Sequence, residues 1–229
     1  MSKAPLTIFS AVAILQLLAC GAEESRPRRP AADVRTIYVE HAIRGSEDRE
    51  DVTVTLQFRK GVSGTNMGLG TGGVELDGNP LAGDSSALGG VFYDATIPAV
   101  SAPGMHVITY MGPRGPVADT FVFRPFSVPP TLAGLRRGTD WSVAVSGLPN
   151  GTGVLVALTD TAFLTNDIVE TVPVSGGMIR LRAARLQKLA TGPVLLELSS
   201  VDSHPPANGA KGQIRVEYSV RRELLLKDR

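Results

Sequence analysis

The chain contains a single cysteine, Cys20, whose thiol can act as a nucleophile, a metal ligand or a site of modification. It lies directly after an apolar stretch, Leu6–Leu18, and before a polar tract that contains prolines. One thiol cannot build a disulfide framework or a zinc cluster within the chain. If Cys20 is used at the N-terminus, the folded body has no thiol and must be stabilised by burial of apolar surface.

The segment before Cys20 has the features of an export signal. Lys3 provides a positive start, and residues 6–18 fit the roughly 7–15-residue apolar core of a secretory signal. A membrane-spanning helix needs about 20 apolar residues, so this stretch is short for one. The alternatives are an ordinary secreted protein and a soluble protein with a buried cysteine in its first helix.

The residues Leu17-Leu18-Ala19-Cys20 resemble the lipobox of bacterial lipoproteins. The resemblance implies a diacylglyceryl group on the Cys20 thiol, cleavage between Ala19 and Cys20, and acylation of the new N-terminus. Several acyl chains anchor a protein stably where one is marginal. An Asp after the cysteine tends to retain members of that family at the inner membrane, so Gly21 favours the outer membrane if the host has one. The predicted location is therefore the bacterial cell envelope, with a lipid anchor.

The N-terminal part of the chain divides into a lipoprotein signal peptide, residues 1–19, and a flexible tether, residues 20–33. The tether is polar, contains two prolines and lacks periodicity. Its arginines, Arg26, Arg28 and Arg29, could contact anionic lipid headgroups, although a plain linker is the simpler interpretation.

A glycine-rich loop, residues 61–78, is the motif closest to a cofactor site. Its Gly68, Gly70, Gly72 and Gly73 could cradle a phosphate only if a helix followed the loop. The following Val-Glu-Leu-Asp-Gly predicts a strand instead, so we expect a connecting loop and no cofactor.

Metal binding is not expected. The histidines, His41, His106 and His204, are far apart and lack a metal-binding spacing, which favours solvated or strand-edge positions. Two sets of side chains could supply oxygen ligands to calcium. One set is Asp77, Asn79 and Asp84, and the other is Asp160 and Asp167, which flank residues 161–166. Neither set matches the twelve-residue calcium loop, and turn-forming roles explain both.

Catalytic motifs are absent from the sequence. No Gly-x-Ser-x-Gly segment occurs, and the adjacent pairs Ser85-Ser86 and Ser199-Ser200 fall in polar turns. The carboxylates Glu23 and Glu24 lie in the tether and cannot be preorganised. Five aromatic residues could form a platform on which a ligand stacks: Tyr93, Tyr110, Phe121, Phe123 and Trp141. Trp141 alternates with valines, however, which favours a role in the core.

The elements that would position these residues are strands. In residues 51–59, Val52, Val54, Leu56 and Phe58 alternate with polar residues, which is typical of a half-buried antiparallel strand. Further strands are expected at residues 35–43, 72–76, 91–97, 106–111, 117–125, 141–148, 154–160, 167–172, 178–183, 194–200 and 213–222. The 25 glycines and 16 prolines suit an all-β chain with many turns.

The Pro-Pro pair at residues 129–130 interrupts the series of strands, which predicts two β-sandwich domains, 34–126 and 127–229. The segments 102–110 and 190–198 form a faint repeat that resembles the corner before the penultimate strand of an immunoglobulin-like domain. The resemblance implies two tandem immunoglobulin-like sandwiches. We also expect a hairpin at Asn150-Gly151, a helical turn within 181–190, and an edge strand or a contact with the first domain from residues 224–226.

These observations favour a lipid-anchored, non-enzymatic binding or structural module that contacts an envelope protein or glycan through loops or an edge strand. A carbohydrate- or small-ligand-binding module is the alternative, and an enzyme is the least favoured class. The formal net charge of +1 argues against nucleic acid as a partner.

Overall fold

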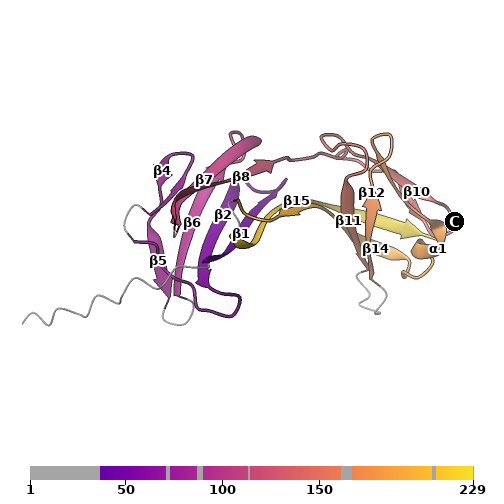
Figure 1. Ribbon diagram of the computed structural model, residues 1–229. Coiled ribbons are helices and arrows are strands. Elements are labelled where there is room, and N and C mark those ends of the chain that lie inside the picture. Colours follow the sequence, from indigo (N-terminus) through magenta and orange to yellow (C-terminus); the bar gives the residue numbers. More distant parts are fainter. Residues whose placement is uncertain are drawn as a thin grey trace, which may run out of the picture. The chain divides into compact units, whose positions relative to one another are not determined.

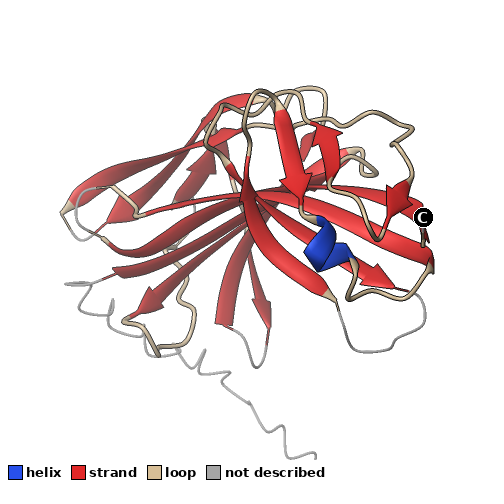
Figure 2. Ribbon diagram, turned by 90° about the vertical axis from the view of Figure 1, so that its right-hand side faces the viewer, coloured by secondary structure: helices blue, strands red, loops and turns tan. Residues whose placement is uncertain are grey.

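The computed structural model describes residues 37–70, 73–86, 90–112, 114–160, 167–207 and 210–228. Almost all regular structure in these residues is β-strand, and α1 (Ala183–Leu186) is the single helix among them (Figure 2). No helix in the described part of the chain is long and apolar enough to cross a membrane. The all-β prediction is therefore confirmed.

The first sandwich consists of two sheets built mainly from the first half of the chain (Figure 1). One sheet contains β1 (Ile37–Ser46), β2 (Asp51–Lys60), β6 (Gly90–Pro98) and β5 (Gly83–Ser86), in that order. The other contains β4 (Asn79–Pro80), β3 (Val74–Leu76), β7 (Gly104–Gly112) and β8 (Gly115–Phe123). The alternating apolar residues of β2 are buried between these sheets, as the period-two pattern predicts.

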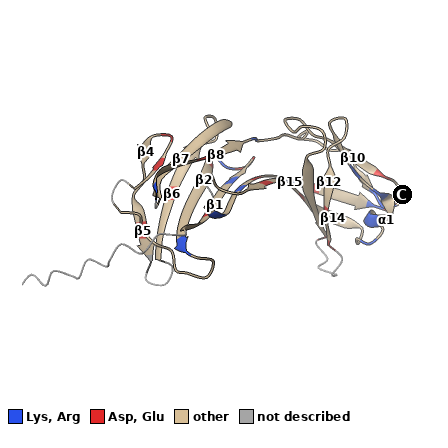
Figure 3. Cartoon of the chain, viewed as in Figure 1, with Lys and Arg blue, Asp and Glu red and all other residues tan. Residues whose placement is uncertain are grey.

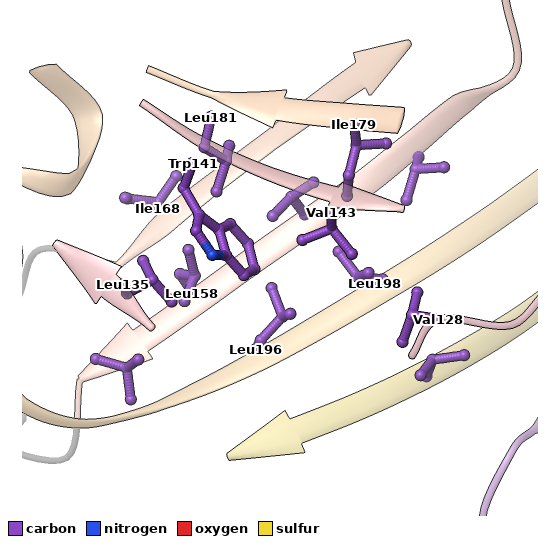
Figure 4. Packing of buried hydrophobic residues seen from close by; sticks show 14 of the residues in the cluster. Val128, Leu135, Trp141, Val143, Leu158, Ile168, Ile179, Leu181, Leu196 and Leu198 are labelled. Carbon is purple, nitrogen blue, oxygen red and sulfur yellow. The ribbon is translucent and has the colours of Figure 1, made fainter. Parts of the chain in front are cut away.

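The second sandwich packs a large sheet against a two-stranded one. The large sheet contains β12 (Ile168–Pro173), β11 (Gly153–Asp160), β14 (Gly192–His204) and β15 (Lys211–Lys227), with the short β9 (Leu135–Arg136) beside β15. The small sheet pairs β10 (Trp141–Ala144) with β13 (Met178–Leu181). Between them, Trp141 lies among aliphatic side chains such as Leu158 and Leu196 (Figure 4), and its Nε1 donates to the carbonyl of Ala133 at 3.0 Å.

Both sandwiches have the strand order of an immunoglobulin-like fold. In the first, β1-β2-β6-β5 correspond to strands A, B, E and D, and β4-β3-β7-β8 to C′, C, F and G. In the second, β10 and β13 correspond to B and E, and β12-β11-β14-β15 to C′, C, F and G. The second sandwich has no strand in the D position among the described residues. The predicted pair of immunoglobulin-like sandwiches is thus present.

Strand β15 belongs to both sandwiches. Its residues Lys211–Ser219 pair in parallel with Tyr38–Ser46 of β1, and its residues Ile214–Leu226 pair antiparallel with β14. The two large sheets therefore join into one nine-stranded sheet. Ile214 and Val216 contribute to the first core, whereas Val220 and Leu226 contribute to the second.

The faint internal repeat corresponds to the F–G hairpins, β7–β8 and β14–β15. Gly104 and Gly192, which begin the two F strands, have φ of 130° and 127°. Gly115 and Gly212, at the starts of the two G strands, have φ of 121° and 119°. Residues with side chains rarely adopt this backbone conformation, which explains a glycine at each repeated position.

Two local expectations are wrong. The Asn150-Gly151 turn does not close a hairpin, because β10 before it pairs with β13 while β11 after it pairs with β12 and β14. The turn instead carries the chain from one sheet to the other. Residues 224–226 form neither an edge strand nor a contact with the first core: they continue β15, and Leu226 is buried in the second core.

The expected helical turn within residues 181–190 is confirmed as α1, which connects strands E and F of the second sandwich. The domain boundary at residues 126–127 stays a prediction. The buried hydrophobic residues fall into two clusters. The first runs from Ile37 to Phe123 and also includes Ile214 and Val216 of β15. The second begins at Phe126.

Substitution of Gly212 would test how much the shared sheet depends on a close backbone contact between β15 and β1. A Cβ at Gly212 would lie 1.8 Å from the carbonyl oxygen of Val39, whereas a Cβ at Gly192 would meet nothing within 4 Å at a similar φ. Gly212→Ala should therefore reduce the free energy of unfolding by about 2 kcal/mol more than Gly192→Ala, measured by urea denaturation. Equal losses would contradict a tight β1–β15 contact.

Candidate functional site

The predicted lipidation site and signal cleavage site, Cys20 and Ala19, lie outside the described residues, as do the tether residues. These assignments stay predictions. Gly72 and residues 161–166 between Asp160 and Asp167 also lie outside the described residues.

The glycine-rich loop connects two strands. β2 ends at Lys60 and the next strand is β3, so the helix that a phosphate cradle requires does not follow. The loop is held to the sheet, because the backbone N–H of Leu69 donates to the Tyr93 hydroxyl at 2.8 Å and that of Met67 donates to the carbonyl of Phe58 at 2.7 Å. These contacts give it a structural role.

The expectation that the histidines are solvated or at strand edges is wrong for two of them. His41 in β1 is fully buried and His106 in β7 is 7% exposed, whereas His204 at the end of β14 is partly exposed. Both buried rings sit on the core-facing side of their strands, since His41 alternates with Val39 and Ile43. No group of three or more potential metal ligands occurs among the described residues.

His106 is held by the turn residue Asp77. Its Nδ1 lies 2.7 Å from Asp77 Oδ2 and its Nε2 lies 2.8 Å from the carbonyl oxygen of Ala102, while the ring stacks on Phe121 at 5.0 Å. Asp77 Oδ1 also accepts a hydrogen bond from the N–H of Val107 at 2.8 Å. Asp77 therefore serves as the turn residue that the sequence indicates, and its carboxylate fixes strand β7 to the β3–β4 turn.

The other acidic candidates make local contacts. Asp84 Oδ1 accepts from the N–H of Ser85 at 2.7 Å, and Asn79 Nδ2 donates to the carbonyl of Asp77 at 3.4 Å. Asp160 is buried and its Oδ2 accepts from the N–H of Ala190 at 3.0 Å, which connects β11 to the segment after α1. Each of these side chains therefore holds a backbone N–H or carbonyl group in place, which is a structural role.

A buried polar cluster lies within the first sandwich and consists of His41, Tyr110 and Asp119. His41 and Asp119 are fully buried and Tyr110 is 2% exposed. His41 Nε2 lies 3.9 Å from Asp119 Oδ2, which is too far for a hydrogen bond. Asp119 Oδ1 accepts a hydrogen bond from the N–H of Ala207 at 2.5 Å, so this carboxylate ties β8 to the segment between β14 and β15.

Burial controls the ionisation of the cluster. Desolvation lowers the pKa of His41 to about 3, so its ring is neutral at ordinary pH. Desolvation also raises the pKa of Asp119, while the hydrogen bond from the N–H of Ala207 and the nearby Tyr110 hydroxyl and His204 ring lower it. The pKa of Tyr110 is raised by burial and by the Asp119 charge. A strongly perturbed ionisable set can mark a catalytic site, but this one is closed to a substrate.

The candidate stacking residues are core residues, as predicted for Trp141. Tyr93, Tyr110, Phe121, Phe123 and Trp141 are each at most 5% exposed. Among the aromatic side chains that the structure describes, the most accessible are half-buried: Tyr38, Phe92 and Tyr218. The described residues therefore present no exposed aromatic face of the kind that sugar binding uses.

An arginine-lined groove on the second sandwich is an accessible candidate site. It lies between β12 and β13, has a volume of about 750 Å³, and is lined by residues 170–173, Ser175, Arg180, Arg182 and Arg185. Ile179 and Leu181 point into the core, so the alternation of an extended chain places Arg180 and Arg182 on the outside. Arg182 has extended backbone angles, φ −77° and ψ 143°, immediately before α1.

The groove carries an excess of positive charge. Glu170 is its one carboxylate among the lining residues, and its Oε2 is already paired with Arg185 Nε at 2.9 Å. Arg180 Nε makes a weak contact with Ser142 Oγ at 3.4 Å, and Arg182 is exposed. Figure 3 shows basic residues (blue) at α1, the helix that contributes Arg185 to the lining of the groove. The groove can therefore attract an anionic group.

Neither the buried cluster nor the groove was predicted from the sequence. Asp119 occurs at alternate positions with Phe121 and Phe123, which was a readable sign of a core-facing carboxylate. The arginines also alternate with apolar residues in the segment Arg180–Arg182, but nothing local indicates that strand D is absent beside them. That absence depends on the topology of the whole sandwich.

Comparisons with known proteins give no family. No protein-family model and no curated protein matches the chain. Among solved structures, a tetra-tandem repeat from the extending region of a large adhesion protein shares 15% identity with a TM-score of 0.27, covering 81% of this chain and 49% of that one. The chain thus spans about half the length of that structure.

Two titin structures are also similar. A tandem pair of titin immunoglobulin domains shares 12% identity with a TM-score of 0.24, covering 84% of this chain and 96% of that one. A second titin segment shares 15% identity with a TM-score of 0.25, covering 80% and 98%. At these TM-scores, the assignment of two immunoglobulin-like sandwiches rests on the strand order described above.

The low pKa of His41 predicts acid sensitivity. Between its ordinary value of 6.5 and about 3, the unfolded chain binds a proton at His41 that the folded chain does not. The free energy of unfolding should therefore fall as pH falls through this range, by up to about 5 kcal/mol, with Asp119 opposing the effect because its pKa is raised. His41→Leu should flatten this dependence in urea titrations at several pH values.

His204→Gln is the matched control, because it removes a histidine that is partly exposed. It should leave most of the pH dependence in place. A His41→Leu profile as steep as that of the unaltered protein would contradict the role assigned to burial of His41.

Proposed function

We propose that the protein is a lipid-anchored envelope module that binds a partner protein through its pair of immunoglobulin-like sandwiches. The observation that carries the anchor is the sequence Leu17-Leu18-Ala19-Cys20 at the end of an apolar run. The favoured site is the outer membrane, because Gly21 follows the cysteine.

The position of the first strand supports a stand-off role. The chain from Cys20 to the start of β1 at Ile37 contains 17 residues. Fully extended, this length spans at most about 60 Å. The anchor therefore leaves the sandwiches within reach of the membrane surface and of other envelope components.

The arrangement of polar groups supports binding in preference to catalysis. The ionisable groups with strongly shifted pKa values in the first sandwich are buried within the core. The accessible groove presents arginines and strand edges, which are means of recognition. The alternative of a sugar-binding module has no supporting observation, because the described aromatic residues are buried or half-buried.

Substitution of the cysteine tests the anchor. Cys20→Ser should abolish incorporation of radiolabelled fatty acid and release the protein from membrane fractions, because no thiol remains to be acylated. Continued membrane attachment of this variant would contradict the lipoprotein assignment.

Gly21→Asp is the companion variant for sorting. It keeps the thiol, so lipid labelling should persist while the protein moves from the outer-membrane to the inner-membrane fraction on a density gradient. Unchanged outer-membrane sedimentation would contradict the sorting proposal alone and leave the anchor intact.

Crosslinking in intact cells tests the binding role. The unaltered protein should give a discrete crosslinked species that contains a second polypeptide. A chain that crosslinks to no protein under conditions that capture other envelope complexes would contradict the proposed role.

A further inference from the structure

The two sandwiches differ at one edge. In the first, strand E (β6) pairs on its outer side with strand D (β5). In the second, the chain passes from β12 to β13 through a short turn around Gly176 and Gly177, which have φ of 58° and 72°. Strand E (β13) therefore pairs with β10 on one side, while on its other side Met178 is bridged to Ser175 of the turn and no described strand pairs with Arg180.

The arginine-lined groove lies along this uncovered edge. Its walls are β12 on one sheet and β13 with α1 on the other, and its volume of about 750 Å³ falls within the range of ligand sites. An uncovered edge offers backbone donors and acceptors to an added strand. The groove thus combines the part of this edge beyond Met178, at Arg180, with space beside it.

The charges along the edge match an extended anionic chain. Arg180 and Arg182 are two residues apart, so extended backbone places them on one side about 6.5 Å apart. Carboxylates at alternate positions of a second extended chain have the same spacing. Glu170 cannot neutralise both arginines, because it is paired with Arg185 at 2.9 Å.

The first sandwich shows which kind of chain occupies this position. Its strand D, β5, is a short segment of sequence Gly-Asp-Ser-Ser that carries an exposed carboxylate at Asp84. It has no bulky apolar side chain and is held by backbone pairing with β6. A strand of similar character would suit the uncovered edge of β13.

We propose that an extended acidic segment of a partner protein adds to β13 as the missing strand D, with alternate carboxylates on Arg180 and Arg182. The proposal deepens the binding role proposed above and rests on it. Backbone pairing supplies affinity and the two arginines select for acidic residues.

Synthetic peptides test this proposal on the full-length protein, purified in detergent from the membrane or from whichever fraction holds it. A six-residue peptide of alternating Glu and Val should bind. A Lys-Val peptide should bind at least tenfold more weakly, and so should a Glu-Val peptide with proline at its centre, because proline cannot donate to a strand pair. Amide hydrogen exchange should slow at Arg180–Arg182 when the acidic peptide is bound.

The double variant Arg180→Glu with Arg182→Glu should reduce binding of the acidic peptide at least tenfold. The matched control is Arg44→Glu with Arg49→Glu, which makes the same charge change at exposed arginines of the first sandwich and should leave binding unchanged. Circular dichroism is the check that both variants remain folded.

Four results would overturn the proposal. If the proline peptide bound as tightly as the alternating Glu-Val peptide, the site would be an anion patch with no strand addition. Binding of inorganic polyphosphate with equal affinity, without slowed amide exchange in β13, would lead to the same conclusion. No binding of the acidic peptide would show that the arginines only protect the edge. Equal binding by both double variants would place the peptide elsewhere. None of these results depends on the Cys20→Ser outcome, so failure of the anchor and failure of the groove are distinguishable.

Discussion

The parallel pairing of β15 with β1 is the contact on which the described structure depends. β15 completes the second sandwich as its G strand and also extends the first sandwich beyond its A strand. This double use requires that the backbone at Gly212 approach the Val39 carbonyl more closely than any side chain allows. Tyr218 of β15 also contacts both cores: its ring lies 5.8 Å from that of Phe123 in the first core and 5.4 Å from that of Phe126 in the second. The two sandwiches therefore share backbone hydrogen bonds, and a change in one G strand affects both cores.

The buried carboxylate of Asp119 reinforces that connection at an energetic cost. Burying an ionisable group is unfavourable unless its oxygens are paired, and one oxygen of Asp119 pairs with the N–H of Ala207. The other lies 3.9 Å from a histidine that burial keeps neutral. The contact fixes the chain between β14 and β15 against β8, next to the start of β15. A hydrophobic residue at this position would bury more favourably but would leave the Ala207 N–H without that acceptor.

The sequence predicted the strands well because each pattern was local. Alternation in β2, β8 and β11 sets which side chains face the core, and the structure follows that alternation. Pairing was harder to predict. Asn150-Gly151 adopts a turn, with Gly151 at φ 86°, but which strands pair across it depends on the sheet to which each belongs. The buried histidines were missed because His41 was judged by residue type, although its alternation with Val39 and Ile43 indicated the core. The groove could not be found from local pattern, since it arises where no described strand occupies the D position of the second sandwich.

The absent strand has a physical consequence for the second sandwich. An uncovered edge invites pairing between molecules, and proteins often place charged side chains there to prevent it. Charge of one sign repels a second copy of the same edge, because arginines would face arginines. The same charge attracts a chain of opposite sign, so protection against self-association and selection of an acidic partner are one property of Arg180 and Arg182. The first sandwich needs no such charge at this position, because β5 already covers the edge of β6. Two copies of one fold thus differ at this edge through the length of a single connection, the short turn between β12 and β13.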